Sequence, residues 1–410
     1  MNKPRPYHVV LYGASGFTGQ QTVQYFAQNL GDDQVRWAIA GRNLQKLEQV
    51  KANLAVPVDI LIAESQDQEG LDEIAAQAQV ILNTAGPFAL HGDALVDACV
   101  RHKTHYVDIT GETPWVKSLI QRYHAKAAAE GTRIIPFCGF DSVPSDLGTY
   151  LLVRFMQQEL GVSCQQVKAY FQAAGGFNGG TLASATNLMQ SGQAAQMADP
   201  FLLNPQGFTA NGIENNPDPS WPQYDKVLKA WIAPFFMGPV NTRVVRRSCA
   251  LFEQWQAAYG SNFTYQEYLK FDGPWASLSA FGATLGTGLF GLALSQPWAW
   301  SLLQSRLPQP GSGPSQKVMD EGWFRCELIG QAADGQMARG LIQNQGDPGN
   351  RSTVKFLCES ALCLATEADQ LPDQQRGGVL TPATGLGTLL ADRLRRAGTI
   401  IQLAPYKSKN

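Results

Sequence analysis

The sequence predicts an α/β protein in which a doubly wound parallel sheet precedes a second, mixed α/β domain. Three observations support this prediction. Short apolar runs alternate with helical stretches over the first third of the chain, a pattern typical of parallel strands joined by helices. Three glycines spaced three residues apart follow directly on the first apolar run, in "GASGFTG" (13–19). After residue 146 the alternation stops and strand-like runs become dense, which predicts a second sheet.

The first domain, residues 1–145, is expected to have the Rossmann architecture, which binds its ligand beyond the carboxyl ends of the strands. Apolar runs predict strands at 8–12, 35–40, 58–62, 79–83, 105–109 and 133–138. Helical patterns lie between them, at 17–29, 43–52, 67–76, 92–102 and 114–130.

Residues 146–375 are expected to form a mixed-sheet domain that holds the substrate or an interface. Alternating patterns predict strands at 164–173, 241–252 and 262–271, and a hairpin at 323–345 that turns at 333–335. Helices are expected at 180–192 and 352–366, and long loops over the Pro-, Gly- and Asn-rich stretch 193–240. A last helix (384–397) and strand (399–403) form a segment, 376–410, that can pack back on the Rossmann domain.

The glycine turn is typical of a dinucleotide site. Gly13 allows the tight turn, Gly16 lets the backbone approach a diphosphate, and Gly19 lets the helix pack closely on the sheet. The free N–H groups of the first helical turn then face the anion. The remaining positions of the turn complete this set with amides and hydroxyl groups: Ala14, Ser15, Phe17 and Thr18.

The end of the second predicted strand favours NADP(H) over NAD(H). An NAD site places a carboxylate there for the ribose 2′-hydroxyl, but no Asp or Glu occurs between Asp33 and Glu48. Instead Arg42 ends the strand, Asn43 is expected to cap the next helix, and Lys46 lies one turn on. A guanidinium suits a 2′-phosphate; the alternative for Arg42 is an ordinary solvated charge.

The loop after the fourth predicted strand is expected to contact the ribose and nicotinamide. It consists of small residues, Thr84, Ala85 and Gly86, followed by Pro87. It emerges at the edge where doubly wound folds bind ligands. The alternative is a plain turn, since Gly and Pro also mark turns.

Nine motifs together resemble the saccharopine-dehydrogenase-like oxidoreductases. They occur in this order: "GASGFTG", "AGRN", "NTAGPF", "YVDITGE", "CGFDSVPSDLG", "GGTLAS", "VVRRS", "GDPGNRST" and "GGVLTPATGLG". The branch that the chain resembles most is the trans-acting enoyl reductases, which serve lipid-making polyketide synthases. The resemblance implies a Rossmann domain, a mixed second domain and NADPH-dependent reduction of an acyl chain. The saccharopine reductases of lysine metabolism must bind a dicarboxylate amino acid. This sequence shows no set of arginines suited to binding one.

We therefore expect an NADPH-dependent oxidoreductase that reduces an enoyl or related carbonyl group of an apolar acyl or lipid-type substrate, either small or tethered to a carrier. Two alternatives stay open: an amino-acid oxidoreductase of the saccharopine dehydrogenase type, and an NADP(H)-sensing protein without turnover.

Hydride transfer to an enoyl thioester requires a stabilised oxyanion and a proton source. Ser142 and the backbone amides around Gly139–Ser142 are candidates for the first role, and Asp141 for an orienting or proton-relay role. Gly139 is also expected to contact the cofactor. Thr181 is expected to face the same cleft from the second domain. Tyr106 is a candidate proton donor. The alternatives are helix capping for Asp141 and core packing for Tyr106.

Charge and cysteine content limit the partners and the compartment. The net charge of −2 does not favour nucleic acid, and seven cysteines without framework spacing indicate a reducing compartment. The first strand starts too early to leave room for a signal peptide, so we expect a cytoplasmic protein. His102 and His105 bracket a turn without further ligands, and no metal site is expected.

Two segments offer interaction surfaces. No charged residue occurs from Gly273 to Ser305, whose apolar centre is "AFGATLGTGLFGLALS" (280–295). This centre is short for a spanning helix, so we expect a buried helix, a subunit interface in a homo-oligomer or a substrate cover, with peripheral membrane contact as the alternative. Arg243, Arg246 and Arg247 are expected on a solvated strand edge, or as a dock for an acidic carrier.

Overall fold

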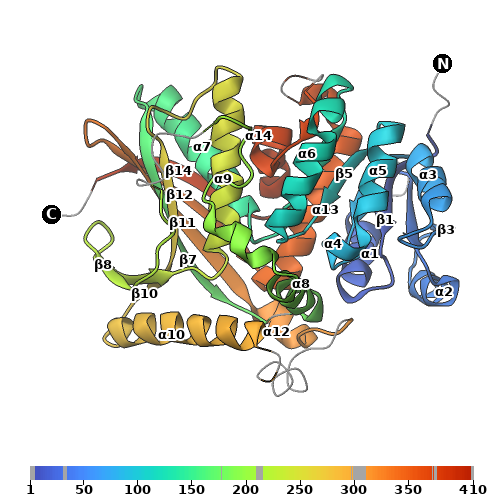
Figure 1. Ribbon diagram of the computed structural model, residues 1–410, viewed down its shortest axis with the longest axis horizontal. Coiled ribbons are helices and arrows are strands. Elements are labelled where there is room, and N and C mark those ends of the chain that lie inside the picture. The colour runs from blue at the N-terminus through green and yellow to red at the C-terminus, as the bar shows by residue number, and fades with distance from the viewer. Residues whose placement is uncertain are drawn as a thin grey trace.

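The protein contains two seven-stranded sheets with helices packed on and between them (Figure 1). The structure is a computed structural model. It describes residues 5–30, 35–176, 178–208, 216–296, 298, 311–371, 373 and 376–407.

The first sheet is parallel throughout and has the strand order β13-β6-β5-β4-β1-β2-β3. Its strands are β1 (Tyr7–Tyr12), β2 (Trp37–Gly41), β3 (Asp59–Ile62), β4 (Ala78–Asn83), β5 (His105–Asp108), β6 (Arg133–Ile135) and β13 (Gly378–Val379). The order reverses between β1 and β4, which makes the carboxyl ends of these strands the expected ligand edge. The predicted doubly wound α/β fold is confirmed.

Helices cover both faces of this sheet, because both faces of its strands are apolar. Val9 and Leu11 of β1 belong to one hydrophobic core, and Val10 and Tyr12 to the other. The helices of this part are α1 (Phe17–Asn29), α2 (Leu44–Ala52), α3 (Gln68–Gln77), α4 (Phe88–His91), α5 (Asp93–His102) and α6 (Thr113–Ala129). All but the short α4 were predicted from the sequence.

The second sheet is mixed, as predicted, with the order β14-β12-β11-β7-β10-β9-β8. Only β7 and β10 are parallel neighbours; the other pairs are antiparallel. The strands are β7 (Cys164–Ala174), β8 (Gln223–Asp225), β9 (Ala230–Pro234), β10 (Thr264–Phe271), β11 (Trp323–Ala332), β12 (Met337–Gln345) and β14 (Ile400–Tyr406).

The second part of the chain supplies the remaining helices. The longer ones are α7 (Val143–Glu159), α8 (Gly179–Gln190), α9 (Gly238–Gln254), α10 (Ala276–Ser295), α13 (Thr353–Thr366) and α14 (Pro382–Arg396). The shorter ones are η1 (Gln193–Ala198), α12 (Gln316–Glu321), η3 (Pro348–Ser352) and η4 (Ala368–Gln370). The stretch 193–240, predicted as loops, thus also contains η1, β8 and β9.

The chain after residue 376 contributes to both sheets. β13 pairs with β6 of the parallel sheet, and β14 pairs with β12 of the mixed sheet. The domain boundaries at 145/146 and 375/376 stay predictions.

Helix α7 connects the parallel sheet to the mixed one, and its polar start is buried. The Asp146 carboxylate accepts hydrogen bonds from Ser248 Oγ of α9 and, at 2.8 Å, from the backbone N of Ala383 in α14. Burial raises the pKa of Asp146 to about 7, although these hydrogen bonds oppose the shift. Polar contacts thus tie α7 to two other helices of the interior.

The predicted strand at 241–252 is wrong: this segment lies in α9. The alternating pattern of this segment favoured the strand interpretation, but the packing of the helix against the rest of the protein outweighs that local pattern. Fourteen residues of α9 are buried, including the three arginines. The arginines therefore form neither a solvated strand edge nor a surface dock.

The arginines instead attach the stretch 197–203 to α9. Arg243 donates to the carbonyl oxygens of Met197 and Asp199 and forms an ion pair with Asp218. Arg246 and Arg247 donate to the carbonyl oxygens of Pro200 and Leu203. Burial lowers the pKa of Arg247 to about 9.

The prediction of a buried helix at 280–295 is also wrong. In α10 only Ala276, Ala280 and Leu294 are buried. Among the described residues α10 is the one helix whose length and composition would let it cross a membrane, with a mean hydropathy of 1.4 and 11% of that stretch buried. Residues 297 and 299–305 of the charge-free segment lie outside the described residues.

We expect Arg243→Met to lower the free energy of unfolding by about 2–4 kcal/mol, because the carbonyl oxygens of residues 197 and 199 lose their donor and Asp218 loses its shortest ion pair. Asp218 is then left with the Thr242 hydroxyl and, at 3.5 Å, Arg246. Denaturant unfolding at neutral pH measures the change. Arg395→Met is the matched control, since Arg395 pairs with Asp392 on the surface and should change stability by less than about 0.5 kcal/mol. Equal effects of the two substitutions would contradict the assignment.

Candidate functional site

The glycine turn between β1 and α1 has the geometry of an anion cradle. Gly13 has φ +86°, in the left-handed region that favours glycine. A Cβ at Gly19 would lie 2.2 Å from the carbonyl oxygen of Gly13, so no larger residue fits there. The backbone of Gly16 occupies the N-cap position of α1.

The start of α1 has no side-chain cap and no acidic residue in its first turn. By contrast, α2, α3 and α8 are capped by the side chains of Asn43, Asp67 and Asn178. The first amides of α1 therefore remain available to an external acceptor, and the helix dipole favours an anion there. The turn from Gly13 to Gly19 fits the diphosphate of a dinucleotide.

The loop that follows β4 touches this turn. A Cβ at Gly13 would lie 2.8 Å from the backbone N of Ala85 and 2.9 Å from Thr84 Oγ1. Thr84 is fixed because its N and Oγ1 donate to the Tyr12 carbonyl oxygen at 2.9 and 3.1 Å. Gly86 and Pro87 continue the loop toward α4. The structure thus brings the predicted 13–19 and 84–87 segments together.

The basic residues at the end of β2 are free to bind. Arg42, Asn43 and Lys46 are exposed, and neither cation forms an ion pair with a described residue. Asn43 caps α2 as predicted, because its Oδ1 accepts from the Lys46 backbone N at 2.9 Å. Two unpaired cations beside the adenosine end of a dinucleotide site suit a 2′-phosphate.

The second domain reaches the glycine turn from the side of α8. A Cβ at Gly313 would lie 2.3 Å from the Phe17 ring, so this stretch of backbone lies directly on Phe17. In the same stretch, the Ser312 carbonyl oxygen accepts from Gly179 N of α8 at 2.9 Å. The backbone at 312–313 therefore connects the glycine turn to the start of α8.

Tyr106 is fully buried in a hydrogen-bond network at the ends of β4 and β5. Its hydroxyl donates to Asp108 Oδ2 at 2.8 Å and accepts from Asn83 Nδ2 at 3.0 Å. Asn83 Oδ1 in turn accepts from the Ala85 backbone N at 2.8 Å. This arrangement supports the cofactor loop, and it matches the core-packing alternative for Tyr106.

Glu112 links three segments at the same edge and was not predicted as a site residue. Its carboxylate accepts from the backbone N of Phe88 and Ala89, at 2.8 and 3.0 Å, and from Ser184 Oγ of α8, at 2.8 Å. The carboxylate thus caps α4 and attaches α8 to the edge of the parallel sheet where the carboxyl ends of β1, β4 and β5 lie, which we call the cofactor edge. Its place in "YVDITGE" was the signal that could have identified it.

The loop after β6 carries Gly139, Asp141 and Ser142 to this edge. The neighbouring Phe140 N donates to Thr353 Oγ1 at 3.1 Å, which attaches the loop to the second domain. Asp141 is partly exposed and has no hydrogen-bond partner among the described residues. Desolvation raises the pKa of its carboxyl to about 6, near the value that proton transfer at neutral pH requires.

Ser142 begins a buried chain of hydrogen bonds. Its Oγ donates to Asn241 Oδ1 at 3.0 Å, and Asn241 Nδ2 donates to Glu267 Oε1 at 2.8 Å. Glu267 Oε2 also accepts from the hydroxyl groups of Ser145 and Tyr265, at 2.8 and 2.9 Å. Burial raises the pKa of Glu267 to about 8, and these hydrogen bonds oppose the shift. Sequence reasoning missed Asn241 and Glu267, which face Ser142 from distant segments.

Thr181 lies in the first turn of α8 and is exposed. Its N and Oγ1 both donate to Asn178 Oδ1, at 2.9 and 3.1 Å. Asn178 Nδ2 donates to Asn350 Oδ1 at 3.1 Å, and Asn350 Nδ2 donates to Asp347 at 2.6 Å. The motif "GDPGNRST" thus orients the start of α8, the helix that also carries Ser184 to Glu112.

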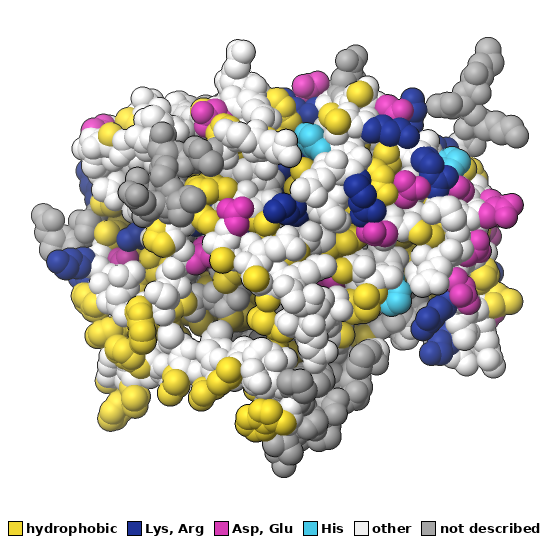
Figure 2. Space-filling view, in the orientation of Figure 1, with side chains coloured by type: hydrophobic (Ala, Val, Ile, Leu, Met, Phe, Trp, Pro, Cys, Tyr) yellow, Lys and Arg dark blue, Asp and Glu magenta, His cyan; other side chains and the backbone are white. Residues whose placement is uncertain are grey.

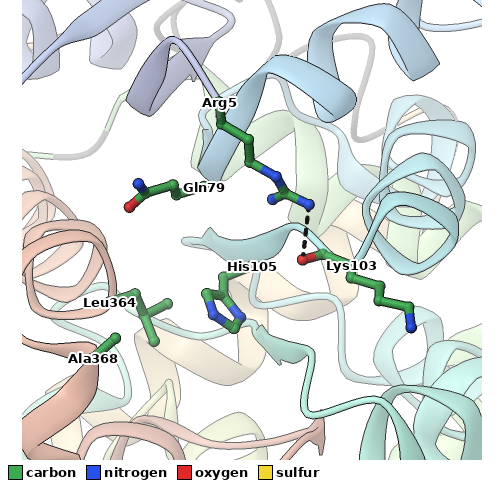
Figure 3. A pocket seen from close by; sticks show the side chains of 6 residues that line it. All are labelled: Arg5, Gln79, Lys103, His105, Leu364 and Ala368. Atoms are coloured by element: carbon green, nitrogen blue, oxygen red, sulfur yellow. Dashed lines mark hydrogen bonds between the residues drawn. The ribbon is translucent and has the colours of Figure 1, made fainter. Parts of the chain in front are cut away.

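A separate cavity lies at the opposite edge of the parallel sheet (Figure 3). It has a volume of about 300 Å³, and its lining includes Arg5, Lys103 and His105. The side chain of Arg5 donates to the backbone oxygens of Ala78 and Lys103, and His105 has its pKa lowered to about 4 by burial and by Arg133. Because it adjoins the amino ends of β4 and β5, this cavity is not the cofactor edge. Over the described ranges no group of three or more His, Cys, Asp or Glu residues is placed to hold a metal.

Comparison with known proteins agrees with this geometry. Residues 9–135 match the saccharopine dehydrogenase NADP-binding domain. A Mycobacterium tuberculosis protein whose name assigns it to the trans-acting enoyl reductases is 35% identical over 97% of this chain and 98% of its own. The trans-acting enoyl reductase of Mycobacterium ulcerans is 34% identical over 97% of each chain.

The chain belongs to the saccharopine dehydrogenase-like oxidoreductases. It therefore carries an NADP(H)-binding domain and is an NADP-dependent oxidoreductase by family. Saccharopine dehydrogenase (L-Glu forming) from Saccharomyces cerevisiae shares the fold over 97% of this chain and 99% of its own, with a TM-score of 0.56 at 13% identity. Homospermidine synthase from Legionella pneumophila, solved with NAD, covers 98% of this chain and 92% of its own, with a TM-score of 0.51 at 11% identity.

We expect Arg42→Ala to weaken NADPH binding by about 10- to 100-fold while NADH binding changes by less than about threefold, because only NADPH has the 2′-phosphate that the guanidinium would pair with. Titration calorimetry with both nucleotides measures the difference. Arg36→Ala, at the amino end of β2, is the control and should leave both affinities unchanged. Equal losses for the two nucleotides would refute the role of Arg42.

Protonation of Glu267 should make stability depend on pH. The pKa of Glu267 is higher in the folded than in the unfolded protein. The free energy that the protonated carboxyl contributes to stability is therefore fully present below about pH 4.5 and is lost as the pH rises toward 8. Glu267→Gln has no titrating carboxyl at this position, so the variant does not lose stability in this way. The free energy of unfolding of the variant relative to the wild type should therefore rise between about pH 5 and pH 8, by about 1.4 kcal/mol per unit of pKa shift.

Denaturant unfolding across this pH range tests the expectation. Glu321→Gln is the control, since Glu321 lies in an exposed ion pair with Lys317 and its substitution should change the free energy of unfolding by less than about 0.5 kcal/mol. A pH-independent difference for Glu267→Gln would show that the carboxyl is ionised throughout.

Proposed function

We propose that this protein reduces an enoyl or related carbonyl group of an apolar acyl substrate with NADPH, the substrate being free or tethered to a carrier. The observation that carries the proposal is the 33–35% identity, over 97% of the chain, to proteins named trans-acting enoyl reductases. The likeness to saccharopine dehydrogenase supports the fold alone.

The proposed roles follow from the placement of the residues. NADPH supplies the hydride when bound, so the chain must position both reactants, stabilise the oxyanion and deliver a proton. The backbone amides of Gly139, Asp141 and Ser142 are candidates for the oxyanion site, whereas the Phe140 amide is already donated to Thr353 Oγ1. Asp141, partly exposed and with its pKa near 6, is the candidate proton relay. Thr181 can contact the substrate from α8.

The hydrogen-bond chain behind Ser142 gives Glu267 a proposed role in this site. With Glu267 ionised, Asn241 donates to it and Ser142 must donate to Asn241, which leaves only acceptor lone pairs on Ser142. With Glu267 protonated the chain can reverse: Glu267 donates to the Asn241 oxygen, the Asn241 amide donates to Ser142, and Ser142 can donate outward. A hydroxyl that donates outward is what an oxyanion requires.

Two other functions stay candidates. An amino-acid oxidoreductase of the saccharopine dehydrogenase type would need cations for a dicarboxylate substrate, but Arg243, Arg246 and Arg247 are buried and donate to carbonyl oxygens or pair with Asp218. An NADP(H)-sensing protein would bind the nucleotide without turnover. Assays of NADPH oxidation with enoyl thioesters, ketones and imines distinguish the three.

We expect Asp141→Asn and Ser142→Ala each to lower turnover of a medium- or long-chain enoyl thioester by about 10²- to 10⁴-fold, with the NADPH affinity changed less than about threefold. Initial rates of NADPH oxidation and calorimetry with NADPH measure the two quantities. Asp392→Asn and Ser191→Ala are exposed controls that should preserve turnover. Full turnover in both site variants would eliminate the proposed roles.

A further inference from the structure

Helix α10 presents an unusually large uncovered surface. It lies along the lower edge of the molecule in Figure 1, where it packs against α8, β9 and β10. All six residues from Leu285 to Phe290 are exposed, and they make up more than one and a half helical turns. In this stretch the helix is therefore uncovered around most of its circumference.

The uncovered surface is apolar and extends beyond the helix. Leu278, Leu285 and Leu289 are 66%, 65% and 58% exposed. The Phe281 ring lies 6.0 Å from the Trp231 ring, which connects the helix to strand β9. Figure 2 shows this row of hydrophobic side chains along the same lower edge. Proteins that stay in water rarely leave so large a continuous apolar patch uncovered.

The charge pattern and the ends of the helix favour lipid over a protein partner. No charged residue occurs from Gly273 to Ser305, so the surface offers no ion pair to a polar partner. Trp275 and Trp298, on either side of α10, are 72% and 70% exposed. Tryptophan is enriched at the boundary between water and lipid. A protein groove covers one stripe of a helix, whereas lipid can close around several sides.

We propose that α10 docks this protein on a lipid bilayer, with the helix axis in the plane of the surface. The helix cannot span, because Ala276 and Ala280 near one end and Leu294 near the other are buried against the body of the protein. An in-plane helix buries its apolar side at the headgroup–acyl boundary. Since α10 has no cation, binding rests on apolar contact and should not require anionic lipid.

This inference goes beyond the proposed function and does not depend on it. It does, however, place the membrane next to α8, the helix that carries Thr181 and contacts Glu112 through Ser184. An apolar substrate dissolved in the bilayer would then be close to the cofactor edge.

Flotation of the full-length protein with phosphatidylcholine vesicles tests the proposal. We expect the wild type to float with these vesicles and to remain bound in about 1 M salt, where the Debye length falls to about 3 Å. The double variant Leu285→Asp/Leu289→Asp should lower the vesicle partition coefficient by more than about tenfold, because it replaces two exposed leucines that the bilayer would bury. Ile400→Asp is the control, because Ile400 is also exposed but lies at the start of β14, and this variant should float like the wild type.

A second measurement follows the position of the helix directly. All seven native cysteines are buried, so L285C and I400C can each be labelled selectively with an environment-sensitive fluorophore. Vesicles should raise and blue-shift the emission of the label in L285C and leave that in I400C unchanged. Calorimetry with NADPH on each variant checks that the fold is intact, independently of any turnover.

Three results would overturn the proposal. The first is wild-type protein that does not float with neutral or anionic vesicles. The second is flotation that needs anionic lipid and disappears at high salt, which would place the contact on charged residues elsewhere. The third combines two observations: the wild type does not float, and sedimentation equilibrium shows a dimer that Leu285→Asp/Leu289→Asp dissociates. This result would assign the surface to a second copy of the chain.

Discussion

The buried polar start of α7 is the constraint on which the arrangement of this protein depends. Ser142 and Asp146 lie out of reach of water, where a polar group without a partner is costly. Their partners, Asn241 and Ser248, come from α9, and Glu267 of β10 completes the set behind Asn241. These hydrogen bonds link the start of α7, directly after the loop that follows β6, to α9 and β10 of the second domain. They therefore hold the cofactor edge against the second domain.

The parts of the fold that local rules determine could be predicted from the sequence. The helix at 17–29 coincides with α1, and the glycine turn before it has the close contacts that its spacing indicates. The basic character of the end of β2 could also be predicted, because Arg42 and the lack of any acidic residue near it are visible in the sequence. The hairpin at 323–345 likewise follows from its alternation and turn residues, and it forms β11 and β12.

The parts that depend on distant contacts could not be predicted. The alternation over 241–252 favours a strand locally, and that local pattern does not show the distant partners that allow the arginines of this helix to be buried. These partners are carbonyl oxygens of residues 197–203, 265 and 379, together with the carboxylate of Asp218. Glu112 and Glu267 have partners many positions away, so no spacing rule connects them to the site. Asp141 and Ser142 were chosen as candidates because they follow a predicted strand, and their roles stay predictions. The residues behind Ser142 were missed because the segment that carries Asn241 was assigned to the wrong element.

The C-terminal segment has a consequence for how the chain is made. It places β13 beside β6 and β14 beside β12, so each sheet receives an edge strand from the last part of the polypeptide. Domains usually fold one after another as they leave the ribosome. Here a nascent chain that has not yet reached residue 378 holds two unfinished sheets, each with an open edge. Neither sheet can therefore be completed before residues 378–406 have been synthesised.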